Sequence, residues 1–127
     1  MYKVIIADDE PRAIEVLEKL LGNFAGYTVI KTIRDESEIL PSVIALEPDL
    51  LFLDINLGQT TGMDVARELN MLGRPLQIIF ITAYNQYALE AFDCKACDYL
   101  LKPVSLARLS QALKHFEEHY HVNVPIE

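Results

Sequence analysis

The sequence predicts one doubly wound α/β domain, built on a five-stranded parallel sheet with five helices. Three observations lead to this prediction. Short apolar segments alternate with helix-like segments along the whole chain, the apolar segments lack the period-2 alternation of half-exposed strands, and several end on a polar residue. The chain has 127 residues, of which 51% are hydrophobic, and this size suits one compact domain with its own core.

The first half of the chain alternates strand, helix, strand and helix. A β-branched apolar run ends in Asp8-Asp9-Glu10-Pro11, and Pro11 suits the first turn of the helix that follows. Apolar residues then recur at helical spacing until Gly22-Asn23 stops the pattern. The elements predicted here are a strand over 3–7, a helix over 11–21, a strand over 27–33 and a helix over about 37–46.

The second half repeats the alternation, and polar residues follow its strands. The apolar run 50–53 reads as a buried strand that ends on Asp54, the next strand ends on Thr82, and the last ends on Lys102. Ser105 is a suitable N-cap for the final helix. The elements predicted here are strands over 50–53, 77–81 and 98–101, with helices over 62–69, 84–92 and about 105–119. We expect the flavodoxin-like strand order 2-1-3-4-5.

Three carboxylates are predicted to meet at one edge of the sheet. In this topology the switch point lies between the first and third strands, so Asp8, Asp9 and Asp54 converge there. Converging carboxylates repel one another unless a cation is present, and oxygen ligands with open positions suit Mg²⁺. Lys102 and Thr82 stand at the same edge and can neutralise charge on oxygens carried by Asp54, as phosphoryl transfer requires.

With these residues the chain resembles a bacterial response-regulator receiver domain over essentially its whole length. The resemblance rests on four features in order, each at the end of a predicted strand: Asp8-Asp9, Asp54 with Gly62 eight residues later, Thr82-Ala83, and Lys102-Pro103. The segments 82–89 and 98–103 are similar to receivers attached to LytTR-type DNA-binding domains. The resemblance implies a switch in a two-component system that accepts phosphoryl from a histidine kinase, without being an enzyme in its own right.

The resemblance also implies a role for each matching residue. Asp54 would be the phosphoacceptor, and Asp9, Asp54 and the backbone carbonyl of Asn56 would ligate Mg²⁺. Asp8 would contact the metal through water. Thr82 and Lys102 would bind the phosphoryl oxygens, and Tyr99 would change rotamer together with Thr82.

Other positions bear on loop dynamics and on output. Gly58 stands where the family commonly has proline, which loosens the loop after the acceptor. Tyr84 is placed to shield an acyl phosphate from water, so we expect slow autodephosphorylation. Receivers of this kind commonly dimerise on phosphorylation through the fourth helix, the fifth strand and the last helix. For the apolar residues of this region, we predict core rather than partner contacts: Leu89, Phe92 and Leu109.

Composition bounds the location and the partners of the chain. A net charge of −8 repels nucleic acid and anionic membranes. No apolar run approaches the ~20 residues of a membrane span, and no signal-peptide pattern opens the sequence, so we expect a cytoplasmic protein. We assign 1–121 to the receiver domain and 122–127 to a tail or a linker cut short. The protein then either continues into a DNA-binding domain or acts as a stand-alone receiver or scaffold.

Several motifs suggest other functions. Cys94 and Cys97 form a C-x-x-C at the end of a helical pattern, without the second pair that a zinc site needs. His115 and His119 match a zinc-peptidase pattern, for which a solvated polar face is the simpler interpretation. Asp8-Asp9 would repel an FMN phosphate. A Mg²⁺-dependent phosphohydrolase remains an alternative, although neither its D-x-D motif nor its cap domain is visible.

Overall fold

The computed structural model describes residues 1–57 and 61–123, with side chains described as far as residue 120. Gly58 lies outside the described residues. The elements are β1 (Tyr2–Ala7), α1 (Pro11–Leu21), β2 (Tyr27–Ile33), a 3₁₀ turn η1 (Glu36–Glu38), α2 (Ile39–Leu46), β3 (Leu50–Leu53), α3 (Gly62–Asn70), β4 (Gln77–Thr82), α4 (Ala88–Asp93), β5 (Asp98–Leu101) and α5 (Leu106–Asn123).

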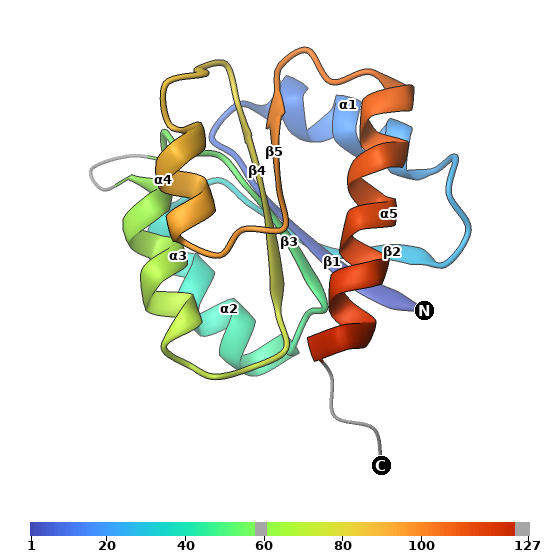
Figure 1. Cartoon of the computed structure of the whole chain (residues 1–127). Coiled ribbons are helices and arrows are strands. Elements are labelled where there is room, and N and C mark those ends of the chain that lie inside the picture. Colours follow the sequence, from blue (N-terminus) through green and yellow to red (C-terminus); the bar gives the residue numbers. More distant parts are fainter. Residues whose placement is uncertain (58–60, 124–127) are drawn as a thin grey trace.

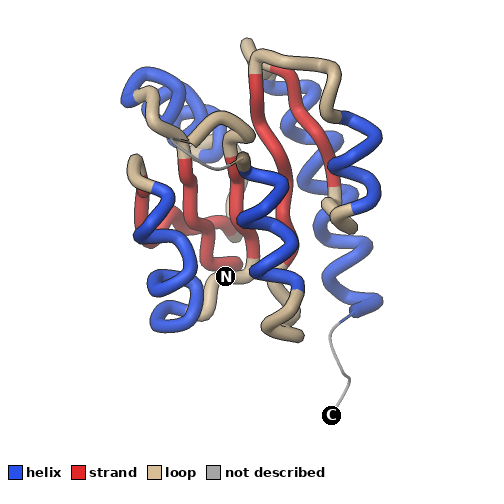
Figure 2. Tube along the Cα trace, turned by 90° about the vertical axis from the view of Figure 1, so that its left-hand side faces the viewer, coloured by secondary structure: helices blue, strands red, loops and turns tan. Residues whose placement is uncertain are grey.

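The five strands form one parallel sheet in the order β2-β1-β3-β4-β5, which confirms the predicted topology. Residues Val4–Ala7 of β1 pair with Leu50–Leu53 of β3, and β3 pairs in turn with the first four residues of β4. The carboxyl ends of β1 and β3 are therefore level, and the residues that follow them emerge side by side. Figure 2 shows the strands as one layer, with the loops gathered at its two ends.

Helices cover both faces of the sheet (Figure 1). Helices α1 and α5 pack on one face, and α2, α3 and α4 pack on the other. Successive strand residues point into opposite cores, so Ile5 and Leu51 face α2 and α3, whereas Val4 and Phe52 face α1 and α5. All four residues of β3 are buried, which explains its uninterrupted apolar run. No helix in the described ranges has the length and apolar character needed to cross a membrane.

One predicted helix start was approximate and another was wrong. The helix predicted from Ser37 begins with the 3₁₀ turn η1, and the helix predicted from Tyr84 begins only at Ala88. Local hydrogen bonds hold the segment before α4 in a turn, because the Tyr84 amide donates to the Thr82 hydroxyl at 3.3 Å and the Tyr84 carbonyl accepts from the Tyr99 hydroxyl. These contacts compete with helical bonding of the same backbone groups.

Helix α5 continues one turn beyond its predicted end at His119. An aromatic cluster holds the end of the helix against the sheet. The centroid of the Phe116 ring lies 4.9 Å from that of Tyr2 and 5.2 Å from that of Tyr120. The Tyr120 hydroxyl also donates to the Asp49 carboxylate. The predicted cap was confirmed, because the Ser105 hydroxyl accepts from the Arg108 amide at 3.1 Å.

The apolar residues of α4 are mostly exposed. The prediction of core contacts was correct for Leu109, which is fully buried, and wrong for Leu89 and Phe92, which are 83% and 82% exposed. Helix α4 is only six residues long, and its buried residue Ala91 is small. The two larger side chains are therefore left on the outer side of a short helix.

Asp98, the first residue of β5, ties this strand to α5. Its carboxylate accepts from both terminal nitrogens of Arg108, at 2.6 and 3.1 Å, and lies 2.9 Å from His115 Nδ1. The simple polar-face interpretation of His115 was therefore incomplete. Burial alone would raise the pKa of Asp98, but the hydrogen bonds from Arg108, the Tyr99 amide and His115 outweigh burial and lower it.

This lowered pKa predicts how Arg108→Gln changes stability with pH. A carboxylate with a depressed folded-state pKa stabilises the fold above its unfolded pKa of about 3.9, and the contribution disappears as pH falls through the folded value. We expect Arg108→Gln to lower the free energy of unfolding by about 1–3 kcal/mol at pH 7. Urea denaturation should show the deficit shrinking below about pH 4, whereas a deficit that grows on acidification would contradict the assignment.

Candidate functional site

The site lies at the carboxyl ends of β1, β3, β4 and β5, at the top of Figure 1. Asp54 directly follows β3, and its amide donates to the carbonyl of Ala7, the last residue of β1, at 3.0 Å. The amide of Lys102, the first residue after β5, donates to the Thr82 carbonyl at 2.8 Å. The sheet register therefore brings the predicted site residues together from four separate parts of the sequence.

Lys102 is the central cation of the site. Its Nζ lies 2.8 Å from the Asp8 carboxylate, 3.0 Å from Glu10 and 3.3 Å from Asp54. Asp8 and Asp54 are both almost completely buried, at 1% and 4% exposure. Asp54 Oδ1 also accepts from the Asn56 amide at 3.2 Å. The sequence predicted the meeting of Lys102 with Asp8 and Asp54, but it gave no role to Glu10.

The carboxylates outnumber the nearby cation. Oxygen atoms of Asp8, Asp9, Glu10 and Asp54 all lie within 4.8 Å of one another, with Asp8 and Asp54 buried and the other two exposed. Hard oxygen donors at such a separation fit Mg²⁺, which takes one or two carboxylates and keeps several waters. The donor set on these two strand ends therefore suits the predicted metal.

Electrostatics in the cluster raise the pKa values of both an acid and a base. Burial raises the pKa of Asp54 to about 6, and the Asp8 carboxylate adds to the rise, while Lys102 and the Asn56 amide oppose it. Burial alone would lower the pKa of Lys102, but hydrogen bonds to Asp8 and Glu10 outweigh it and raise it. The two shifts therefore have different main causes: burial raises the pKa of Asp54, and hydrogen bonds to neighbouring carboxylates raise the pKa of Lys102.

An open cavity of about 320 Å³ leads from solvent to Asp54. Tyr84 stands on its wall, where the sequence predicted a shield. Thr82 is fully buried beside the cavity, and its hydroxyl accepts from the Tyr84 amide. Tyr99 is half-buried, and its hydroxyl donates to the Tyr84 carbonyl. The residues that line the cavity are Asp9, Glu10, Asp54, Asn56, Ala83, Tyr84 and Lys102.

Comparison with known proteins identifies this arrangement. The family of response regulator receiver domains matches residues 4–114. The chain belongs to this family. The receiver is 40% identical over 111 residues to the sensory transduction protein LytR of Staphylococcus haemolyticus, covering 87% of this chain and 43% of that protein. It is 38% identical to the sensory transduction protein LytT of Bacillus subtilis, covering 93% of this chain and 49% of that protein.

A solved structure agrees with the same family. The response regulatory domain of protein mrkE from Klebsiella pneumoniae superposes on the receiver with a TM-score of 0.86 at 30% identity, covering 94% of this chain and 98% of that one. The chain is thus the receiver domain of a two-component response regulator close to the LytR and LytT type. It spans about half the length of these two curated relatives.

Gly62 lets the start of α3 approach the backbone of Asp54 and Ile55 closely. Its amide donates to the Ile55 carbonyl at 2.7 Å, and a Cβ at this position would lie 2.6 Å from the Asp54 carbonyl oxygen. Real Cβ contacts are never this short, so any side chain must push the Asp54 backbone away.

The expected result of Gly62→Ala is a loss of stability of about 1–3 kcal/mol together with weaker Mg²⁺ binding, because Asp54 shifts. Urea denaturation and a Mg²⁺ titration measure the two effects. Gly22→Ala is the matched control, since Gly22 has a helical φ of −61° and its added Cβ would meet only the Lys19 and Glu18 carbonyl oxygens, at 3.3 and 3.7 Å. Equal behaviour of the two variants would argue against the proposed contact.

The remaining candidate motifs lie away from this site. Cys94 caps the end of α4 and is buried, and burial raises the pKa of its thiol. Burial raises the pKa of Cys97 to about 12. Such shifts disfavour the thiolate that redox chemistry needs. His119 Nδ1 contacts the His115 carbonyl at 2.7 Å, while His115 pairs with Asp98. These contacts explain both histidines without a metal.

Proposed function

We propose that the receiver is a phosphorylation-activated switch whose phosphoacceptor is Asp54. The observation that carries the proposal is the contact of Lys102 with both Asp8 and Asp54, inside a cluster of carboxylates beside a cavity that opens to solvent. A histidine kinase supplies the phosphoryl group. The N–P bond of its phosphohistidine breaks, an Asp54 oxygen forms the new O–P bond, and the imidazole leaves with the electron pair.

The chain's own residues hold the reacting groups. Asp9, Asp54 and the backbone carbonyl of Asn56 would hold Mg²⁺, and Asp8 would contact it through water. When bound, the metal neutralises charge that develops on the phosphoryl oxygens. The Lys102 ammonium and the Thr82 hydroxyl bind phosphoryl oxygens. We assign residues 1–121 to this domain; α5 continues two residues farther, to Asn123.

A chain of hydrogen bonds suggests how phosphorylation reaches the surface. The Thr82 hydroxyl accepts from the Tyr84 amide, and the Tyr84 carbonyl accepts from the Tyr99 hydroxyl. If the Thr82 hydroxyl turns toward a phosphoryl oxygen, the Tyr84 amide loses its acceptor and the partner of Tyr99 moves. Tyr99 belongs to β5, so the change is relayed to the surface of α4, β5 and α5. The proposed output is control of a LytTR-type DNA-binding domain.

The outer side of α4 is the part of this surface that fits a second copy on phosphorylation. Leu89 and Phe92 stand almost fully exposed on one short helix. We expect Leu89→Ala combined with Phe92→Ala to abolish dimerisation of the phosphorylated receiver and leave phosphorylation unchanged. Sizing of wild-type and variant protein after phosphorylation measures this. Val16→Ala, an exposed apolar change on α1, is the control and should dimerise normally; a dimer that survives in the double variant would place the interface elsewhere.

A phosphate-release assay separates the switch from a phosphohydrolase. With Mg²⁺ and excess acetyl phosphate, a switch accepts about one phosphoryl group per chain and releases phosphate slowly, because Tyr84 shields the acyl phosphate. Rapid steady release without a phosphorylated intermediate would favour the hydrolase. A phosphoprotein half-life of seconds would contradict the shielding role of Tyr84.

A further inference from the structure

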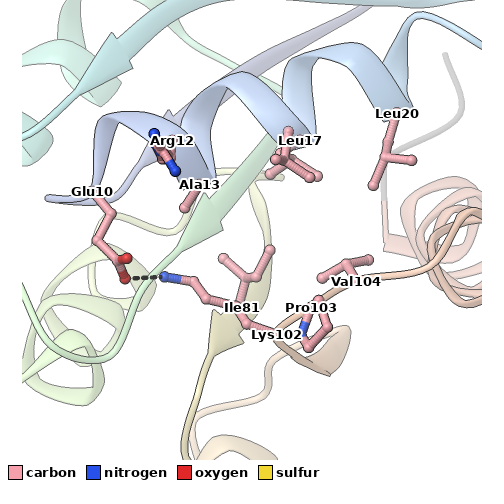
Figure 3. A pocket seen from close by; sticks show the side chains of 10 residues that line it. Glu10, Arg12, Ala13, Leu17, Leu20, Ile81, Lys102, Pro103 and Val104 are labelled. Carbon is pink, nitrogen blue, oxygen red and sulfur yellow. Dashed lines mark hydrogen bonds and ion pairs between the residues drawn. The ribbon is translucent and has the colours of Figure 1, made fainter.

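Lys102 contacts one more carboxylate than the proposed phosphoryl transfer uses. Besides Asp8 and Asp54, its Nζ lies 3.0 Å from Glu10 Oε1, and Figure 3 shows the two side chains reaching toward each other. Glu10 immediately precedes α1, whereas Lys102 follows β5. The contact therefore joins two elements that are distant in the sequence.

The Glu10 side chain serves Lys102 and not its own helix. Glu10 occupies the N-cap of α1, yet its side chain makes no capping hydrogen bond. Its backbone is used locally, because the amide donates to Asp8 Oδ1 at 3.0 Å and the carbonyl accepts from the Ile14 amide at 3.2 Å. Within the described residues, the ion pair of the Glu10 carboxylate is with Lys102. The Glu10 side chain is 63% exposed, against 17% for Lys102, so the glutamate is free to leave and the lysine is not.

Glu10 must compete with a phosphoryl group for the same ammonium. Asp54 carries the phosphoryl group in the proposed reaction, and Lys102 is the cation within reach of Asp54. A phosphoryl oxygen there needs the ammonium that Glu10 holds in the unphosphorylated receiver. The carboxylate also adds negative charge at the mouth that an anionic phosphodonor enters.

We propose that Glu10 is a positioning residue that holds Lys102 toward the cavity mouth before phosphorylation and releases it to the phosphoryl group afterwards. This inference rests on the proposed function. Glu10 and Lys102 also border an apolar groove of about 190 Å³ between α1 and the segment after β5. Release of Glu10 thus changes the charge at the rim of that groove as well, and Figure 3 shows the apolar side chains beside the pair.

Equilibrium binding of beryllofluoride, which mimics a phosphoryl group on aspartate, tests the proposal at saturating Mg²⁺. We expect Glu10→Gln to bind it about 2- to 5-fold more tightly than wild type, the range that an exposed ion pair supplies. Glu10→Asp keeps the charge but shortens the reach to Lys102, so its affinity should approach that of Glu10→Gln. Glu15→Gln removes an equal charge elsewhere on α1 and should bind as wild type does.

Separate outcomes overturn separate claims. Equal beryllofluoride affinity in wild type and Glu10→Gln overturns the inference. Wild-type affinity in Glu10→Asp also overturns it, because the glutamate would then act only through its charge and not through its contact with Lys102. A Mg²⁺ affinity more than tenfold weaker in Glu10→Gln would make Glu10 a metal ligand instead. Wild type that binds Mg²⁺ but no beryllofluoride would overturn the proposed function itself. In a Lys102→Gln background, Glu10→Gln should change nothing, because the glutamate acts through that lysine.

Discussion

Phosphorylation of Asp54 by acetyl phosphate is expected to slow by about 100-fold when Lys102 is replaced by glutamine. The ammonium lies 3.3 Å from Asp54 and is the cation available to neutralise charge on a transferring phosphoryl group. Mg²⁺ binding should change in the opposite direction. The carboxylates of Asp8, Asp54 and Glu10 lose their competing cation, so the metal binds more tightly.

The opposite signs make this test specific. The rate of adduct formation at saturating Mg²⁺ and a separate Mg²⁺ titration measure the two effects on the same protein. Lys95→Gln, which changes an exposed lysine between α4 and β5, is the control and should leave both unchanged. A Lys102→Gln variant that loses Mg²⁺ binding along with phosphorylation would indicate a distorted site, and the proposed role of the ammonium would fail.

Phe116→Ala is expected to lower the free energy of unfolding by about 3–5 kcal/mol. The Phe116 ring is fully buried and contacts Tyr2, Tyr27 and Tyr120. Tyr2 and Tyr27 are the first residues of β1 and β2, so their contacts with Phe116 join α5 to the sheet. Truncation leaves a cavity among these rings, and Tm should fall by on the order of 10–20 °C.

The same substitution elsewhere on the receiver provides the control. Phe92→Ala removes an equally large ring that is 82% exposed, and it should change Tm very little. Thermal unfolding of both variants by circular dichroism makes the comparison. If the two variants lose similar stability, the aromatic cluster is not what holds α5 to the sheet.

Much of the fold could be predicted from the sequence, because the hydrophobic pattern and the polar residues after the strands indicated the same elements. The bounds of α1, β2, β3 and β5 match the prediction. Gly22-Asn23 marks the end of α1, the alternating run 27–33 marks β2, and polar residues directly after short apolar runs mark β3 and β5. The meeting of Asp8, Asp54 and Lys102 followed from the strand order, because parallel strands end at one edge.

Tertiary contacts decided what the sequence did not predict. The late start of α4 depends on the hydrogen bond that the Tyr84 amide donates to Thr82 and on the one that its carbonyl accepts from Tyr99, which is distant in the sequence. The exposure of Leu89 and Phe92 depends on how a short helix lies on the sheet. The role of Glu10 had a weak signal, a third acid after Asp8-Asp9, but its partner lies 92 residues away.

The most direct test of the switch is the intact mass of the protein after incubation with Mg²⁺ and acetyl phosphate, recorded beside Asp54→Asn. An asparagine cannot form the acyl phosphate, so the wild type should gain one phosphoryl group that requires Mg²⁺, and the variant should gain none. A wild type that binds Mg²⁺ yet gains no mass, or an Asp54→Asn variant that gains the same mass, would contradict phosphorylation of the receiver at Asp54.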